Sequence, residues 1–135
     1  NVLFSGDQFE RISTVLKRAL LVPADFEDLI DEATKGDIVF VDPPYTVQHN
    51  HNGFVKYNER LFRWDDQERL YYSLLRASHR GAFIVGTNAS HESVVRLYSP
   101  HFRLRKIPRH SVISGHKHCR KPVHELLFYT EENNG

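Results

Sequence analysis

The chain predicts an α/β domain with a mostly parallel sheet and an antiparallel edge strand. Short apolar runs typical of buried strands alternate along the 135 residues with stretches whose apolar side chains repeat at helical spacing. The last two strand-like segments, residues 102–107 and 125–129, alternate apolar and polar side chains instead. Such alternation is typical of half-exposed strands, and it favours an antiparallel edge.

Two helices are predicted ahead of the buried strand at residues 38–41. Residues 9–19 carry apolar side chains at helical spacing. Residues 23–33 do the same and have acids near their start, where a helix favours negative charge. Lys35 and Gly36 follow and have the composition of a helix end.

Two further helices are predicted in the second half of the chain. One begins at residues 64–66, Trp-Asp-Asp, and stops before Gly81. The other covers residues 88–97, with Asn88 or Ser90 as its cap, and Pro100 forbids its continuation.

Three short runs are predicted as strands: Val2–Ser5 before the first helix, and Ile38–Val41 and Ala82–Thr87 between later helices. Ligands of parallel α/β sheets bind at the carboxyl ends of the strands. We therefore expect Ile38–Val41 and Ala82–Thr87 to be adjacent and parallel, with Asp42 and Asn88 at the same edge. Residues 46–63 are polar and aromatic and are predicted to form a long loop, which inside a compact domain is usually functional.

Composition and length set limits on the kind of protein. With 40% hydrophobic and 26% charged residues, the chain can bury one core, so residues 1–130 are expected to form one domain and residues 131–135 a flexible tail. The single cysteine excludes an internal disulfide, and no apolar run is long enough to span a bilayer. We expect a cytoplasmic protein without a membrane partner. The absence of methionine, even at position 1, indicates a fragment of a longer chain.

Positive charge is concentrated near the carboxyl end. Residues 101–124 carry seven lysines and arginines and no acid. A segment of one sign is what a polyanion would select. A solvated strand edge and loop is an equally good explanation of this charge run by itself.

The residues with the clearest chemical pattern directly follow the strand predicted at 38–41. Asp42-Pro43-Pro44-Tyr45 combines a carboxylate, a rigid backbone with two N–H donors removed, and an aromatic face. We call these four residues the ledge. Its hydrogen-bond acceptors suit an amino group attached to a flat ring, because the acceptors bind the amino hydrogens while the ring stacks on Tyr45. Drawing the amino nitrogen toward tetrahedral geometry would make its lone pair available for alkylation. The alternative is a strand that ends in a rigid turn, with Asp42 as a cap.

The sequence resembles the Dam-type (D12 class) DNA adenine-N6 methyltransferases. Asp42 to Tyr45 resemble catalytic motif IV of that family, and further similar segments follow in the same order along the chain. These segments are Phe54–Asn58, Phe62, Asp66-Gln67, Gly86–Asn88, Ser111–Ser114, Arg120-Lys121 and Glu125–Leu127. The match at Gly6-Asp7 and Phe9 is weaker.

The resemblance implies a part of a Rossmann-like methyltransferase sheet. It implies site-specific transfer of a methyl group from S-adenosylmethionine to N6 of a flipped adenine in double-stranded DNA. The site residues implied are as follows: Asp42, Pro43, Pro44 and Tyr45 for catalysis; Asp7 and Asp42 for the cofactor; Tyr45, Phe54 and Tyr57 for the adenine; and Arg109, Ser111, Lys117, Arg120 and Lys121 for DNA phosphates.

Part of the family pattern is missing from the sequence. A lysine-bearing opening and a Phe-x-Gly-x-Gly-type loop are not found, and no two of the seven glycines are closer than Gly81 and Gly86. The chain therefore resembles the carboxy-terminal part of such an enzyme. A partial parallel sheet exposes an apolar edge, which an amino-terminal half or self-association would cover.

Other functions stay open at this stage. One is a DNA-binding remnant without catalysis, and another is methylation of an amide or amino group of a protein or small molecule. A metal site is disfavoured, because the histidines and Cys119 lack the paired spacing of known ligand sets.

Overall fold

The computed structural model describes residues 9–47, 61–109 and 123–131. The described elements are α1 (Phe9–Leu16), α2 (Phe26–Glu32), β1 (Ile38–Val41), α4 (Trp64–His79), β2 (Phe83–Ala89), α5 (Glu92–Tyr98), β3 (Arg103–Arg109) and β4 (Val123–Tyr129). Their order confirms the predicted α/β class. The strand expected at residues 2–5 and most of the loop expected at residues 46–63 lie outside the described residues.

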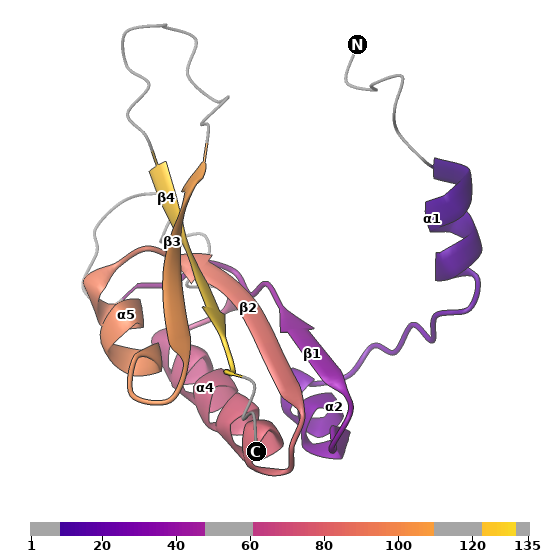
Figure 1. Cartoon of the computed structure of the whole chain (residues 1–135), viewed down its shortest axis with the longest axis horizontal. Coiled ribbons are helices and arrows are strands. Elements are labelled where there is room, and N and C mark those ends of the chain that lie inside the picture. Colours follow the sequence, from indigo (N-terminus) through magenta and orange to yellow (C-terminus); the bar gives the residue numbers. More distant parts are fainter. Residues whose placement is uncertain (1–8, 48–60, 110–122, 132–135) are drawn as a thin grey trace, which may run out of the picture.

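The four described strands form one open sheet in the order β1-β2-β4-β3 (Figure 1). β1 and β2 pair in parallel, with Val41 opposite Gly86, as expected. β4 pairs antiparallel with both β2 and β3. β1, β2 and β3 therefore run in one direction. The expected antiparallel edge is confirmed, because the edge strand β3 pairs antiparallel with β4. The expectation of mostly parallel pairing is corrected, because two of the three strand pairs among the described residues are antiparallel.

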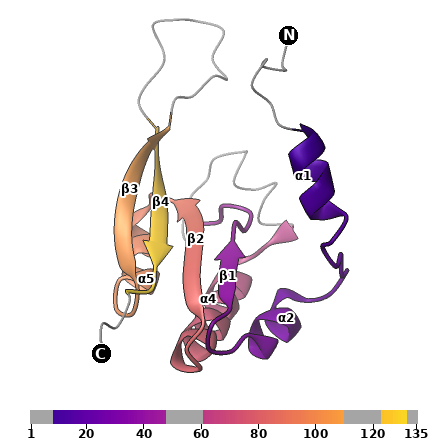
Figure 2. The same cartoon turned by 45° about the vertical axis from the view of Figure 1, so that its right-hand side comes forward.

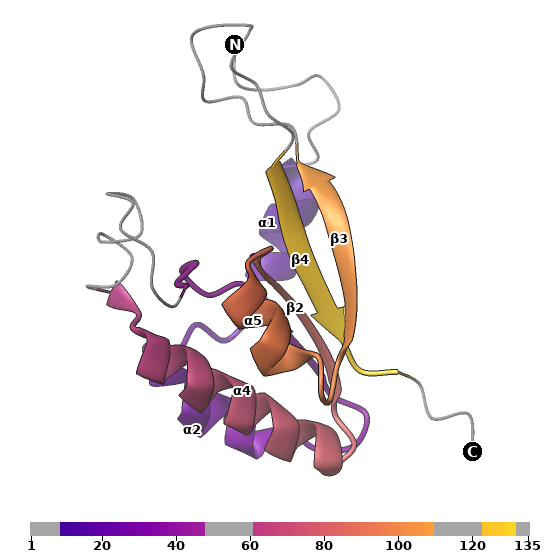
Figure 3. The same cartoon turned by 90° about the vertical axis from the view of Figure 1, so that its left-hand side faces the viewer.

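One face of the sheet is covered by helices, and the core lies between them. Figure 3 shows α4 and α5 on the same side of the strands, with α2 beside α4. The largest fully buried apolar side chains come from these helices and from the facing sides of β2 and β4: Leu74, Ile84, Val94, Tyr98, Leu126 and Phe128. Alternate residues of β2 are buried and half-buried, so the other face of the sheet is more open. No helix among the described residues covers that second face.

The aromatic ring of Phe128 explains the glycine in the middle of β2. Gly86 lies opposite Phe128 of β4. A side-chain carbon at Gly86 would lie 2.7 Å from both Cε atoms of Phe128, well inside ordinary contact distance. The Phe128 ring is fully buried, and its centroid lies 4.2 Å from that of Tyr98. The ring thus fills the space above the glycine, so the absence of a side chain there is a packing requirement.

Buried polar side chains in this core are mutually satisfied. Gln67 of α4 donates to the Tyr98 hydroxyl at 2.7 Å, and Asn88 of β2 donates to Gln67 at 3.1 Å. This network explains why α5 begins later than expected. Asn88 lies in β2 and is committed to the core, whereas the His91 side chain caps α5 by accepting from the Ser93 backbone N–H.

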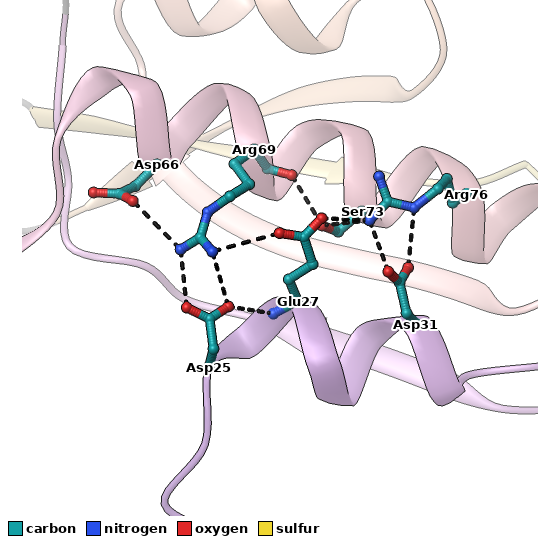
Figure 4. A network of polar contacts seen from close by, with 7 residues as sticks. All are labelled: Asp25, Glu27, Asp31, Asp66, Arg69, Ser73 and Arg76. Atoms are coloured by element: carbon teal, nitrogen blue, oxygen red, sulfur yellow. Dashed lines mark hydrogen bonds and ion pairs between the residues drawn. The ribbon is translucent and has the colours of Figure 1, made fainter.

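Ion pairs join α2 to α4 (Figure 4). Arg69 contacts Asp25 at 3.0 Å and Glu27 at 3.4 Å, and Arg76 contacts Glu27 at 2.6 Å and Asp31 at 2.8 Å. Several charges that share partners in this way form a network rather than isolated surface pairs. Because α2 immediately precedes β1, the network fixes the point from which the chain enters the sheet.

The first helix stands apart from this core (Figure 2). None of its residues is buried, although Phe9, Ile12, Val15 and Leu16 follow helical spacing. The helix predicted for this segment is therefore confirmed. Among the described residues, no helix is long and apolar enough to cross a membrane.

Candidate active site

The ledge lies at the carboxyl end of the parallel pair of strands. Asp42 follows Val41, the last residue of β1, and the neighbouring strand β2 continues through Asn88. This confirms that Asp42 and Asn88 lie at the same edge. Their side chains differ in surroundings, because Asn88 is fully buried and bound to Gln67, whereas Asp42 is exposed. Asn88 is therefore part of the core, and Asp42 faces the open side.

The residue after the ledge anchors it to a distant part of the chain. Thr46 is 1% exposed, and its hydroxyl donates to the main-chain carbonyl of Phe62 at 2.6 Å. Pro43 and Pro44 have fixed φ angles and no N–H to donate. The chain therefore leaves β1 through two rigid residues and is held again directly after Tyr45.

An open pocket of about 610 Å³ lies over this ledge. It is lined by Phe40, Asp42, Pro43, Pro44, Tyr45, Thr87 and Glu125. The structure thus brings together the four ledge residues that the sequence singled out. Sequence reasoning missed the lining roles of Phe40, Thr87 and Glu125. The pairing order could have revealed them, because β2 and β4 are neighbours and the alternation of each strand places Thr87 and Glu125 on the open face.

Polar contacts connect the ledge to the neighbouring strands. The Thr87 hydroxyl donates to Oδ1 of Asp42 at 2.5 Å. Burial raises the pKa of the Tyr45 hydroxyl above its usual value, a hydrogen bond with Thr87 partly opposes the rise, and the carboxylates of Glu125 and Asp42 add to it. The pocket therefore combines two acidic side chains with a phenol that keeps its proton at physiological pH. This set of groups suits a ligand that donates hydrogen bonds or carries positive charge, and it disfavours a phosphate.

The same residues provide what a flat, amine-bearing ligand or cofactor requires. Asp42 offers an oxygen that Thr87 does not occupy, and Tyr45 offers a half-buried ring. Phe40 is 65% exposed on the same face of β1. Within the described parts of the chain, no group of three potential metal ligands occurs. Several histidines and the cysteine lie outside the described residues: His49, His51, His110, His116, His118 and Cys119.

Most of the other predicted site residues fall outside the described parts. These are Asp7, Phe54, Tyr57, Ser111, Lys117, Arg120 and Lys121. Arg109 is the last residue of β3. Of the other basic residues in β3, Arg103 pairs with Glu131 at 2.7 Å, and Arg105 and Lys106 are exposed. The structure thus tests the location of the ledge and leaves the phosphate contacts as predictions.

Comparison with known proteins gives a consistent relationship. A family model described as D12 class N6 adenine-specific DNA methyltransferase matches residues 4–112. The chain is 32% identical over 111 residues to the DNA N-6-adenine-methyltransferase of Escherichia phage P1, an alignment that covers 82% of this chain and 15% of that protein. It is 28% identical over 107 residues to the type II methyltransferase M1.LlaDCHI of Lactococcus lactis subsp. cremoris, covering 79% and 37%. It is 27% identical over 128 residues to the type II methyltransferase M.MjaIII of Methanocaldococcus jannaschii, covering 93% and 44%. The chain spans less than half the length of each of these relatives.

Proposed function

Because the chain belongs to the family of D12 class N6 adenine-specific DNA methyltransferases, we propose that it carries the adenine-binding part of such an enzyme. The reaction proposed is methyl transfer from S-adenosylmethionine to N6 of an adenine flipped out of double-stranded DNA. The observation that carries the proposal is the Asp-Pro-Pro-Tyr ledge at the carboxyl end of β1, lining an open pocket. Acceptors beside an aromatic ring are what an aminated base requires.

The ledge residues have distinct proposed roles. The Asp42 carboxylate and the Pro43 carbonyl accept the two hydrogens of the adenine amino group, and this draws the nitrogen toward tetrahedral geometry. The nitrogen lone pair, otherwise delocalised into the ring, then becomes available to attack. Asp42 accepts the proton that the nitrogen loses once the new bond has formed. Tyr45 stacks on the base, and Pro44 keeps the ledge rigid.

S-adenosylmethionine would supply an electrophilic methyl group at this pocket. In the proposal, Asp42 and Phe40 form one wall of the cofactor site, and Asp7 contributes to the rest. β1 lies at the edge of the described sheet, and the open pocket is lined in part by Phe40 of this strand. A Rossmann-like sheet that continues beyond β1 would close it. That continuation comes from an amino-terminal half or from another copy of the chain.

DNA binding is assigned to the basic segment near the carboxyl end. Arg109, Ser111, Lys117, Arg120 and Lys121 are proposed to contact phosphates and to supply affinity that does not depend on sequence. The exposed Arg105 and Lys106 of β3 extend this charge along the sheet edge. A cytoplasmic location belongs to the same proposal, because the substrate is DNA and the single cysteine suits a reducing compartment.

The test is substitution of Asp42 in the protein as its gene encodes it. Asp42→Ala is expected to abolish methylation of unmethylated genomic DNA by radiolabelled cofactor while leaving duplex binding largely intact, because Asp42 handles the amino group. Tyr45→Ala is expected to cost less, since stacking on a base is worth about 1–3 kcal/mol. Methyl transfer by the Asp42→Ala variant would remove the mechanism.

Two further outcomes separate the alternatives. The 135-residue chain alone is expected to bind S-adenosylmethionine poorly in calorimetry, because its sequence lacks the Phe-x-Gly-x-Gly-type loop. Tight binding by this chain would show that its pocket is built differently from the family pattern. A wild-type protein that binds duplex DNA and transfers no methyl group would instead be a DNA-binding remnant.

A further inference from the structure

Two side chains on neighbouring strands face the ledge from the open side of the sheet. Thr87 lies near the end of β2, and Glu125 lies near the start of β4. The register pairs Thr87 with Leu127 and Ala89 with Glu125, so both side chains are on the same face. Both line the pocket together with Asp42 and Tyr45.

The contacts of these two residues go to the two ledge side chains. Thr87 donates its hydroxyl proton to Oδ1 of Asp42 at 2.5 Å. Glu125 and Thr87 line the pocket together with Tyr45, and Glu125 helps to raise the pKa of the Tyr45 hydroxyl. A hydrogen bond to a carboxylate is stronger than one between neutral groups. Asp42 is therefore held by a partner outside its own segment, and Tyr45 has the Glu125 carboxyl group beside it in the same pocket.

We propose that Thr87 and Glu125 are positioning residues for methyl transfer, with Thr87 orienting Asp42 and Glu125 orienting Tyr45. The inference rests on the proposed function and adds to it the residues that fix the geometry of the ledge.

The exposure of Asp42 makes such a partner necessary. An exposed carboxylate turns freely about its side-chain bonds, and Asp42 is exposed. The contact with Thr87 occupies one carboxylate oxygen and leaves the other for the amino group of the base. A side chain held in its working orientation before the substrate arrives needs no reorganisation during the reaction.

Glu125 has the corresponding effect on the aromatic ring. A hydroxyl fixed at the far end of a tyrosine prevents the ring from swinging about its first side-chain bond. The ring plane is then set before a base stacks on it. Both partners are on the open face of the sheet, outside the buried core, so the fold does not depend on them.

The test of Thr87 uses nearly isosteric variants in the protein as its gene encodes it. Thr87→Val removes the hydroxyl and keeps a β-branched side chain, and we expect kcat to fall about 10- to 100-fold with duplex affinity unchanged. Thr87→Ser restores the hydroxyl and is expected to recover most of the rate. Val85→Thr, two residues earlier on the same face of β2, is the matched control and is expected to leave kcat unchanged.

The test of Glu125 is a double-mutant cycle with Tyr45. Glu125→Ala removes the acceptor, and Tyr45→Phe removes the donor while keeping the ring. If the two act through one hydrogen bond, each variant raises KM for DNA several-fold and the double variant is no worse than either single one. Carbon-13 tyrosine NMR of the chain gives a readout besides activity: in Glu125→Ala the pKa of Tyr45 is expected to fall toward its usual value.

The outcomes distinguish this inference from the proposed function. Wild-type protein without methyl transfer overturns the proposed function, and the NMR titration then still decides whether Glu125 holds Tyr45. An active wild type with an equally active Thr87→Val variant overturns the role of Thr87. Additive effects of Glu125→Ala and Tyr45→Phe, or an unchanged Tyr45 titration, overturn the role of Glu125.

Discussion

Replacing Gly86 by alanine tests how tightly β2 and β4 are packed. The added methyl group would lie 2.7 Å from both Cε atoms of Phe128, where ordinary contact begins near 3.4 Å, so the ring must retreat by about 1 Å. The ring has little room to do so, because its centroid lies 4.2 Å from that of Tyr98 and 5.7 Å from that of Phe102. Overpacking in a filled core costs about 1–3 kcal/mol. We expect the upper end of that range.

The assay is urea and thermal unfolding followed by circular dichroism. A loss of about 3 kcal/mol corresponds to a decrease in Tm of roughly 10 °C for a domain of this size. Phe128→Leu shortens the opposing side chain, so the Gly86→Ala/Phe128→Leu double variant is expected to lose at least about 1 kcal/mol less than the sum of the single variants. A Gly86→Ala variant within about 0.5 kcal/mol of wild type, or strict additivity, would show that the ring does not occupy this space.

Three further predictions concern the ledge anchor, alkaline stability and DNA binding. Thr46→Val leaves a buried main-chain carbonyl without its donor and is expected to lower the free energy of unfolding by about 1–3 kcal/mol, with Thr46→Ser as the control; equal unfolding curves would contradict this. Burial raises the pKa of the Tyr98 hydroxyl far above its usual value. Its contribution to the free energy of unfolding is therefore complete below pH 10 and is lost as the pH rises further, by up to about 1.4 kcal/mol per pH unit. Tyr98→Phe is expected to make this decline less steep, and an unchanged slope would refute the assignment. Charge reversal at Arg120 and Lys121 is expected to weaken binding to all duplexes alike and to reduce its salt dependence in filter-binding titrations, whereas a loss for one sequence alone would mean that they contact bases.

Local patterns predicted the elements that carry the ledge. Four apolar residues between a helix end and two prolines leave little choice but a short buried strand, and β1 has the expected bounds. Because parallel strands end at one edge, the shared location of Asp42 and Asn88 followed from the sequence as well.

Properties set by long-range pairing were harder to predict. The insertion of β4 between β2 and β3 depends on where the chain returns to the sheet, and alternation within a strand does not specify its neighbours. The pocket roles of Thr87 and Glu125 depend on the same insertion. The prediction of the α5 cap was wrong for a related reason. Asn88 is a good capping residue, but in the core its side chain binds Gln67, and His91 caps the helix instead.

The hydrogen bond between Thr46 and Phe62 has a consequence for how proteins of this kind can vary. This bond joins the two ends of the stretch between Thr46 and Phe62, next to the ledge. The distance that the stretch must bridge is therefore set by the fold and does not depend on how many residues the stretch contains. The entropic cost of closing a loop rises by only about 0.6 kcal/mol for each doubling of its length. Insertions, deletions or exchanges between positions 47 and 61 therefore cost little closure entropy as long as the hydrogen bond that holds the ledge is kept.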